Sequence, residues 1–132
     1  MITLKVNYKN LKQRTTLVLT LHYKGNRAIN IYRGSFPWDG VDQIALTALP
    51  VIGNRTDECL EQWGIMNDGV VGDMTIKPNE VFSGEIDLTR QFKNLNQILK
   101  KRDIILFWNY ELAPTTAKAL PRVGGWRLIP RW

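Results

Sequence analysis

Apolar and polar residues alternate along much of this chain, a pattern typical of β-strands that bury one face. Turn-forming residues bound most of the alternating segments. Together these two features predict strands over residues 2–8, 15–23, 28–32, 43–52, 59–63, 81–88 and 126–129. The turn-like sequence Lys24-Gly25-Asn26-Arg27 separates the second and third of these segments, so we expect those two strands to form a hairpin.

The segment Asp103–Leu112 is the strongest strand candidate, because it is rich in β-branched and aromatic residues. Ile104, Leu106 and Trp108 fall on one face of this segment. Ile105 and Phe107 fall on the other face. Since both faces begin apolar, we expect a central strand that is covered on two sides.

The apolar spacing changes after residue 88. Leu88, Phe92, Leu95 and Leu99 are spaced by four, three and four residues, which is helical spacing. Thr89 is a candidate N-terminal cap, and the cations at 100–102 suit the C-terminal end of a helix. The pattern predicts one short helix around residues 89–100 that carries the chain from one sheet to another.

The order of these elements predicts an all-β protein. Eight or nine short strands are joined mostly by turns, and no helix of crossover length separates most neighbours. The two apolar faces of the Asp103–Leu112 segment favour two packed sheets over one open sheet. We therefore predict a single domain over residues 1–132, folded as a two-sheet antiparallel β-sandwich.

Several short motifs support an immunoglobulin-like version of this fold. They are Tyr23–Asn26, Phe36-Pro37-Trp38, Pro78-x-Glu80, Gly84-x-Ile86-Asp87-Leu88 and the strand Asp103–Tyr110. This series resembles immunoglobulin-like β-sandwich domains of bacteria. It is also distantly similar to the β-sandwich propeptides of some secreted metalloproteases, which bind and do not catalyse. The immunoglobulin Cys–Trp–Cys core is absent, since Cys59 is the only cysteine, so the resemblance implies fold more than function.

Charge is distributed unevenly along the 132 residues, although the net charge is only +6. Residues 1–38 hold seven Lys or Arg and no acid, residues 39–87 hold two bases and ten acids, and residues 88–132 hold nine bases and two acids. If the terminal strands lie side by side, the two basic ends form one face for an acidic partner. Alternatively, the opposite charges simply help the segments pair.

The sequence offers little for catalysis. His22 is the only histidine, and no nucleophile-elbow pattern surrounds Ser35 or Ser83. Nothing near Cys59 would activate its thiol. The loop from Asp68 to Asp73 lacks the alternating acids of a calcium site. We therefore expect no catalytic residue, no bound metal and no cofactor.

Aromatic residues interleaved with arginines are the more suggestive pattern, because tryptophan and arginine often anchor protein interfaces. They occur in two segments, the loop 33–40 and the C-terminal segment 122–132. The candidate binding residues are Arg33, Phe36, Trp38, Asp39, Arg122, Trp126, Arg127, Arg131 and Trp132. Two other interpretations stay open: Trp126 is a core residue and Trp38 covers one end of the sandwich, or these side chains stack on nucleic-acid bases.

The pattern as a whole predicts a non-enzymatic protein-binding module, such as an inhibitor or an immunity-type protein, whose partner has an acidic surface. The alternative is a module that binds carbohydrate or nucleic acid. An exposed edge strand would also allow pairing with a second copy. The chain shows no secretory signal and no run of roughly 20 apolar residues, so we expect no membrane association and take the cytoplasm as the default location.

Overall fold

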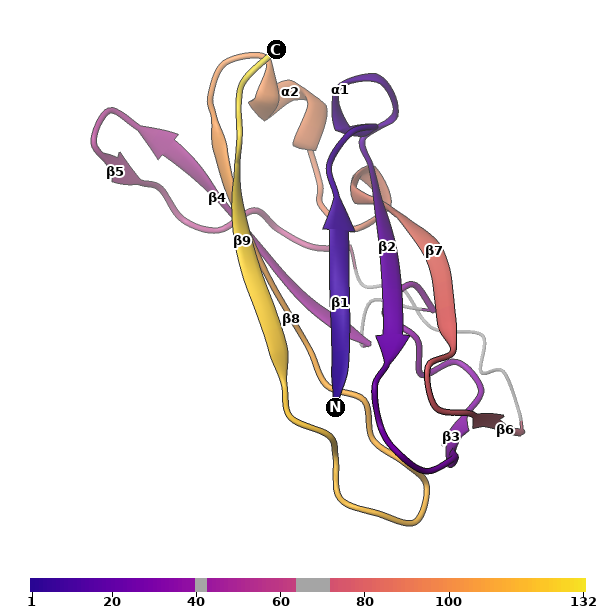
Figure 1. The fold of residues 1–132 in the computed structure, drawn as a ribbon. Coiled ribbons are helices and arrows are strands. Elements are labelled where there is room, and N and C mark those ends of the chain that lie inside the picture. The colour runs from indigo at the N-terminus through magenta and orange to yellow at the C-terminus, as the bar shows by residue number, and fades with distance from the viewer. Residues whose placement is uncertain (40–42, 64–71) are drawn as a thin grey trace.

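The computed structural model describes residues 1–39, 43–63 and 72–132 of the chain and has an all-β architecture, as the sequence predicts (Figure 1). Within these described residues, three very short helices accompany the strands: α1 (Leu11–Arg14), the 3-10 helix η1 (Leu88–Arg90) and α2 (Leu95–Leu99). The strands are β1 (Ile2–Asn7), β2 (Thr16–Tyr23), β3 (Ile29–Tyr32), β4 (Ile44–Ile52), β5 (Arg55–Thr56), β6 (Asp73–Ile76), β7 (Val81–Asp87), β8 (Ile104–Tyr110) and β9 (Val123–Ile129).

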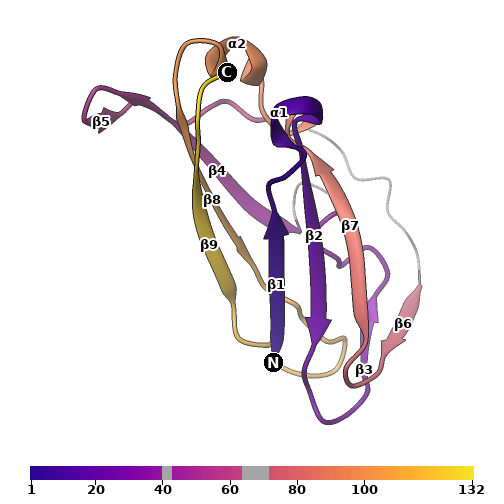
Figure 2. The same ribbon diagram turned by 45° about the horizontal axis from the view of Figure 1, so that its top comes forward.

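The strands form three antiparallel sheets. The sheet orders are β1-β2-β7, β5-β4-β8-β9 and the small pair β3-β6. The first and last strands, β1 and β9, lie side by side at the edges of the two larger sheets, as Figures 1 and 2 show. The two terminal strands therefore lie next to each other, although the N- and C-termini themselves lie at opposite ends of these strands (Figure 1).

The two larger sheets share one apolar core. Leu17, Leu19 and Leu21 of β2 are fully buried, and so are Ile104 and Leu106 of β8. All five belong to the same cluster of buried side chains. Full burial of a leucine or isoleucine stabilises the fold by about 1.5–3 kcal/mol relative to leaving it exposed. Burial of this cluster therefore stabilises the packing of the two sheets against each other.

The helical segment after β7 keeps its predicted apolar stripe and crosses between the two larger sheets, as expected. Leu88, Phe92, Leu95 and Leu99 are all buried. The prediction of one helix around residues 89–100 is wrong, however, because η1 and α2 are separate. Asn94 adopts the left-handed region with φ 60° and interrupts the helical backbone between them.

The predicted helix cap is also wrong. Asp87, and not Thr89, precedes the first helical turn and caps it. The Asp87 Oδ1 atom accepts hydrogen bonds from the Thr89 backbone N at 3.0 Å and from the Thr89 Oγ1 at 2.6 Å. A carboxylate satisfies the free N–H groups of a first turn as well as a hydroxyl does, and here it lies in the residue that ends β7.

The expectation that β8 is covered on two sides is wrong. Its inner face is buried, but on its other face Phe107 keeps 41% of its surface exposed. β8 is central only within its sheet, where β4 and β9 flank it. Among the described residues, the face of β8 that carries Phe107 is therefore open to solvent.

Two strand predictions are corrected by the pairing. β2 and β3 do not form a hairpin, because β1 and β7 occupy both edges of β2 and leave β3 to pair with β6. Residues 59–63 do not form a strand: among the described residues, their β-type pairing is limited to an isolated bridge between Gln62 and Phe92. In the described part of the chain, no helix is long and apolar enough to cross a membrane.

Tyr110 ties β8 to the loop after β3. Its side chain is buried, and its hydroxyl donates a hydrogen bond to the Ser35 carbonyl at 2.5 Å. Burial raises the pKa of the Tyr110 hydroxyl, and the negative charge of Asp39 adds to the shift. Both effects favour the neutral hydroxyl, which is the form that donates this hydrogen bond.

Tyr110→Phe is expected to lower the free energy of unfolding at pH 7 by about 1 kcal/mol, because it removes that hydrogen bond. The folded-state pKa lies above the unfolded value of about 10, so this contribution is intact below pH 10 and is lost as the pH rises further. Urea unfolding of both proteins from pH 7 to 11 measures the effect. A variant whose stability falls as steeply with pH as that of the native protein would contradict it.

Candidate functional site

The predicted binding loop 33–40 is closed mainly on itself and on β6; Gly40 lies outside the described residues. The Asp39 Oδ2 atom accepts a hydrogen bond from the Phe36 backbone N at 2.9 Å, and the Asp39 backbone N donates to the Phe36 carbonyl at 3.0 Å. The Arg33 backbone N donates to the Gly72 carbonyl, and its Nε donates to the Asp73 carbonyl at 3.2 Å. These contacts hold the loop in shape.

The aromatic residues of this loop pack inward. Phe36 is buried, and its ring stacks on the Trp38 ring with a centroid distance of 5.1 Å. The centroid of the Phe36 ring also lies 4.8 Å from that of the Phe82 ring. The half-buried Trp38 ring lies over Gly84, where an added Cβ would come within 2.2 Å of it. These contacts favour the packing interpretation of Trp38, while the predicted role of the loop in binding stays a prediction.

The C-terminal segment is anchored to the body of the protein. The Arg131 backbone N donates to the Asp103 Oδ1 atom at 2.8 Å, and the Trp132 backbone N donates to the Leu99 carbonyl at 2.9 Å. Arg122 forms an ion pair with Glu111 at 3.1 Å, and both side chains are largely exposed. An exposed pair of this kind contributes at most about 1 kcal/mol to stability.

Large apolar side chains are exposed on the solvent side of β8 and β9. Phe107 lies opposite Trp126 in the strand register, and Ile105 lies opposite Leu128. Trp126 is 65% exposed, Leu128 44% and Phe107 41%. We call these four side chains the outer face. The interpretation of Trp126 as a core residue is therefore wrong, because β9 directs this side chain to the open side of its sheet.

Phe107 and Leu128 are functional candidates that the composition of the chain did not single out. The sequence pattern places Phe107 on a face of its strand that we expect to be covered. It places Leu128 in a short strand and does not show which way that residue faces. The alternation of β9, with Trp126 and Leu128 two residues apart, is the signal that could have found Leu128. Only the pairing of β9 with β8 places Phe107 beside Trp126.

Cations lie at one end of the outer face. Arg131 follows Leu128 closely in the sequence, and Lys101 and Arg102 closely precede Ile105. These three cations line one pocket together with Asp103 and the end of β4. An apolar surface with a basic rim at one end is therefore present on this sheet.

A second basic site lies on the opposite side of β9. There the Arg127 guanidinium lies over the Tyr8 ring, 5.1 Å from the ring centroid. Four cations surround the hollow beside this pair, and we call it the basic pocket; they are Lys9, Lys12, Arg127 and Arg131. Two come from the N-terminal part of the chain and two from the C-terminal part, so the two basic ends do meet, as the charge pattern suggested.

In the described part of the chain, the strand register places no acid or cysteine directly opposite His22, the only histidine. The cross-strand neighbours of His22 are Thr3 and Val81, neither of which is an acid or a cysteine. Cys59 is exposed in another part of the fold. Over residues 1–39, 43–63 and 72–132, no group of three or more His, Cys, Asp or Glu side chains is placed to hold a metal ion. Asp68 lies outside the described residues.

Comparison of the chain with protein-family models, with curated proteins and with solved structures finds no match. Among the described residues, we take the outer face and the basic pocket as the candidate sites. Each combines residues that are distant in the sequence.

Gly84→Ala is expected to lower the free energy of unfolding by about 1–3 kcal/mol, because the new methyl group overlaps the Trp38 ring and must displace it. Chemical denaturation monitored by tryptophan fluorescence measures the change. Ser83→Ala is the matched control, since Ser83 is an exposed neighbour on the other face of β7, and its effect should stay within about 0.5 kcal/mol. Equal stability of the two variants would contradict the packing of Trp38 against Gly84.

Proposed function

We propose that this protein is a non-enzymatic protein-binding module and that it binds its partner through the outer face. The observation that carries the proposal is the exposed cross-strand pair of Phe107 and Trp126. Isolated exposed apolar residues are common on protein surfaces, but a contiguous group that includes a tryptophan is typical of an interface. Tryptophan is also among the residues that contribute most to binding energy when a partner buries it.

The charges near the outer face favour a partner with an acidic surface. Lys101, Arg102 and Arg131 lie at one end of it, and the whole chain carries a net charge of +6. Such charges steer an acidic partner toward the apolar residues and raise the association rate. A compact binder that covers an acidic enzyme is the arrangement of an inhibitor or an immunity-type protein, and we propose that role for this chain.

We further propose that the two larger sheets form a single-domain sandwich of the immunoglobulin-like kind. Two features support this. Their buried side chains belong to one cluster. Strands distant in the sequence also pair within each sheet, β2 with β7 and β4 with β8, as in the Greek-key connections of such sandwiches. A scaffold of this kind presents the solvent side of one sheet as a rigid surface.

A module that binds carbohydrate or nucleic acid is the alternative that the same aromatic pair favours. Sugar rings and bases both stack on exposed tryptophan. Binding to a single-stranded oligonucleotide would weaken steeply with salt concentration, because each phosphate contact releases counterions. Binding to a neutral oligosaccharide would not depend on salt. Titrations at two salt concentrations therefore separate these ligands from each other.

The double variant Phe107→Ala/Trp126→Ala is expected to lose the partner while keeping the fold, because both side chains are exposed in the free protein. Removing two anchors of this kind weakens binding by at least about 100-fold. The measurement is a pull-down from lysate of the native source at low and high salt, with bound proteins quantified by mass spectrometry. Tyr32→Ala is the matched control, since Tyr32 is 60% exposed but lies on the small sheet.

The proposal predicts one stoichiometric protein that the native chain and Tyr32→Ala retain and the double variant does not. Retention of that protein by the double variant would show that the outer face is not the interface. Light scattering of the purified chain tests the remaining occupant, a second copy bound along an edge strand. A dimer that persists in the double variant would assign self-association to a different surface.

A further inference from the structure

We propose that the basic pocket binds a small aryl phosphate, that is, a phosphate monoester joined to a flat aromatic ring. The pocket lies where the segment after β1 meets the end of β9. Trp126 and Arg127 are neighbours on β9 whose side chains leave opposite sides of the strand. The basic pocket is therefore distinct from the four side chains of the outer face, although Arg131 lines the pocket and also belongs to the basic rim at one end of that face.

The positive charge of the pocket favours an anionic ligand. Lys9, Lys12, Arg127 and Arg131 line it, and no acidic side chain of the described residues does. Neither of the two ion pairs found among the described residues involves any of these four cations. Like charges gathered in one hollow repel each other, and a bound dianion relieves that repulsion while accepting several charge-assisted hydrogen bonds.

The apolar part of the pocket favours a ligand that carries an aromatic ring. Leu11 and Ile129 are buried residues that form part of its lining, and the side chains of Tyr8 and Trp132 supply aromatic surface beside them. Aromatic rings prefer to contact one another with offset or edge-to-face geometry, which adds to the energy of simple burial. Inorganic phosphate would use only the cations, whereas an aryl phosphate would use both parts of the lining.

The walls of the pocket are held in place before any ligand arrives. The Tyr8 hydroxyl accepts a hydrogen bond from the Trp108 Nε1 at 3.2 Å, and the Arg127 guanidinium lies over the Tyr8 ring. On the other side, the hydrogen bonds of the Arg131 and Trp132 backbone N atoms fasten the C-terminal segment to Asp103 and Leu99. A site that is already ordered loses little entropy when it binds.

The size of the pocket limits the ligand. Its volume is about 260 Å³. A cavity of about 150 Å³ holds a benzene ring, so the pocket has room for one ring and a phosphate group. Typical pockets for drug-sized ligands and cofactors measure about 300–1,000 Å³, which makes a larger cofactor a poor fit.

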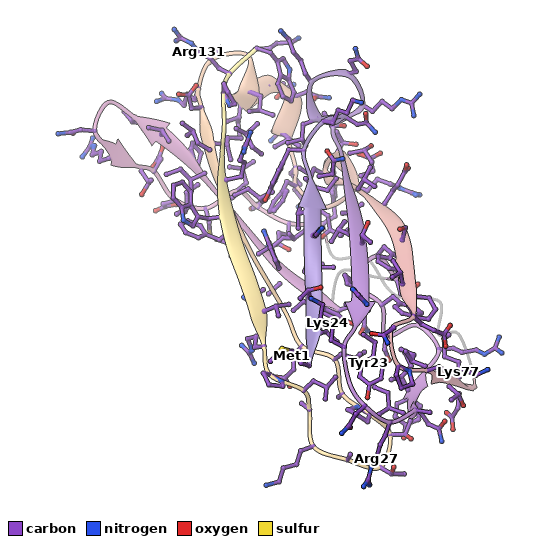
Figure 3. The ribbon with its side chains drawn as sticks, in the orientation of Figure 1. Met1, Tyr23, Lys24, Arg27, Lys77 and Arg131 are labelled. Atoms are coloured by element: carbon purple, nitrogen blue, oxygen red, sulfur yellow. The ribbon has the colours of Figure 1, made fainter. Side chains whose placement is uncertain are left out.

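Isothermal titration of the native chain with phenyl phosphate tests the proposal, with inorganic phosphate and phenol as the two half-ligands. We expect phenyl phosphate to bind more tightly than either, and its binding to weaken as salt is raised. Lys9→Gln/Lys12→Gln is expected to weaken it by at least about tenfold, because the variant loses two charge-assisted hydrogen bonds to the phosphate. Lys24→Gln is the control, because Lys24 follows the end of β2 and lies well away from Arg131 (Figure 3).

A second measurement covers the case in which the double variant is unstable. Amide chemical shifts of the native chain, recorded with and without phenyl phosphate, should change for residues 8–12 and 127–132. Changes confined to other parts of the chain would overturn the proposal. So would the absence of saturable binding at millimolar phenyl phosphate, or equal affinity for phenol and phenyl phosphate.

The same chemistry is carried by a free aryl phosphate and by a phosphotyrosine side chain in a peptide. Titration with a short phosphotyrosine peptide distinguishes these sources. Tighter binding of the peptide than of phenyl phosphate would assign the site to a phosphorylated protein. Weaker binding of the peptide would assign it to a free aryl phosphate, because the peptide backbone would then only obstruct the pocket.

Discussion

Burial of the inner face of β8 is the constraint on which the rest of the structure depends. Ile104, Leu106 and Tyr110 are almost inaccessible to solvent and join the core shared by both larger sheets. Side chains on this face also form hydrogen bonds with segments outside the sheet: Trp108 donates to the Tyr8 hydroxyl, and Tyr110 donates to the Ser35 carbonyl. One strand therefore positions the segment after β1 and the loop after β3, and it is the packing of its alternate side chains that directs Phe107 toward solvent.

Both candidate sites follow from that arrangement. The outer face exists because the inner face of β8 and β9 takes up the core contacts and leaves Trp126 and Phe107 on the open side. The basic pocket exists because β1 and β9 lie side by side at the edges of their sheets, which brings cations from the two ends of the chain together (Figure 2). The charge pattern and the apolar pattern thus produce the two surfaces for which we propose a protein partner and a small anion.

The loop 33–39 shows that residue type alone does not reveal how a side chain packs. Its aromatic and charged composition resembles that of an interface, yet Phe36 is buried and Trp38 fills the space above Gly84. Asp39 is engaged by the backbone of its own loop. A glycine on β7, about 45 residues further along the chain, decides the environment of the tryptophan, and no local pattern reveals that pairing.

The sequence by itself determined the local elements: the all-β class, most strand positions, the apolar stripe from Leu88 to Leu99 and the absence of a disulfide framework. These follow from side-chain period and turn chemistry, which act over a few residues. Only the tertiary structure decided that β2 pairs with β7 instead of β3, and that Phe107 faces solvent. The physical reason is that alternation shows which residues share a face but not which face meets another layer, since that depends on partners distant in the chain.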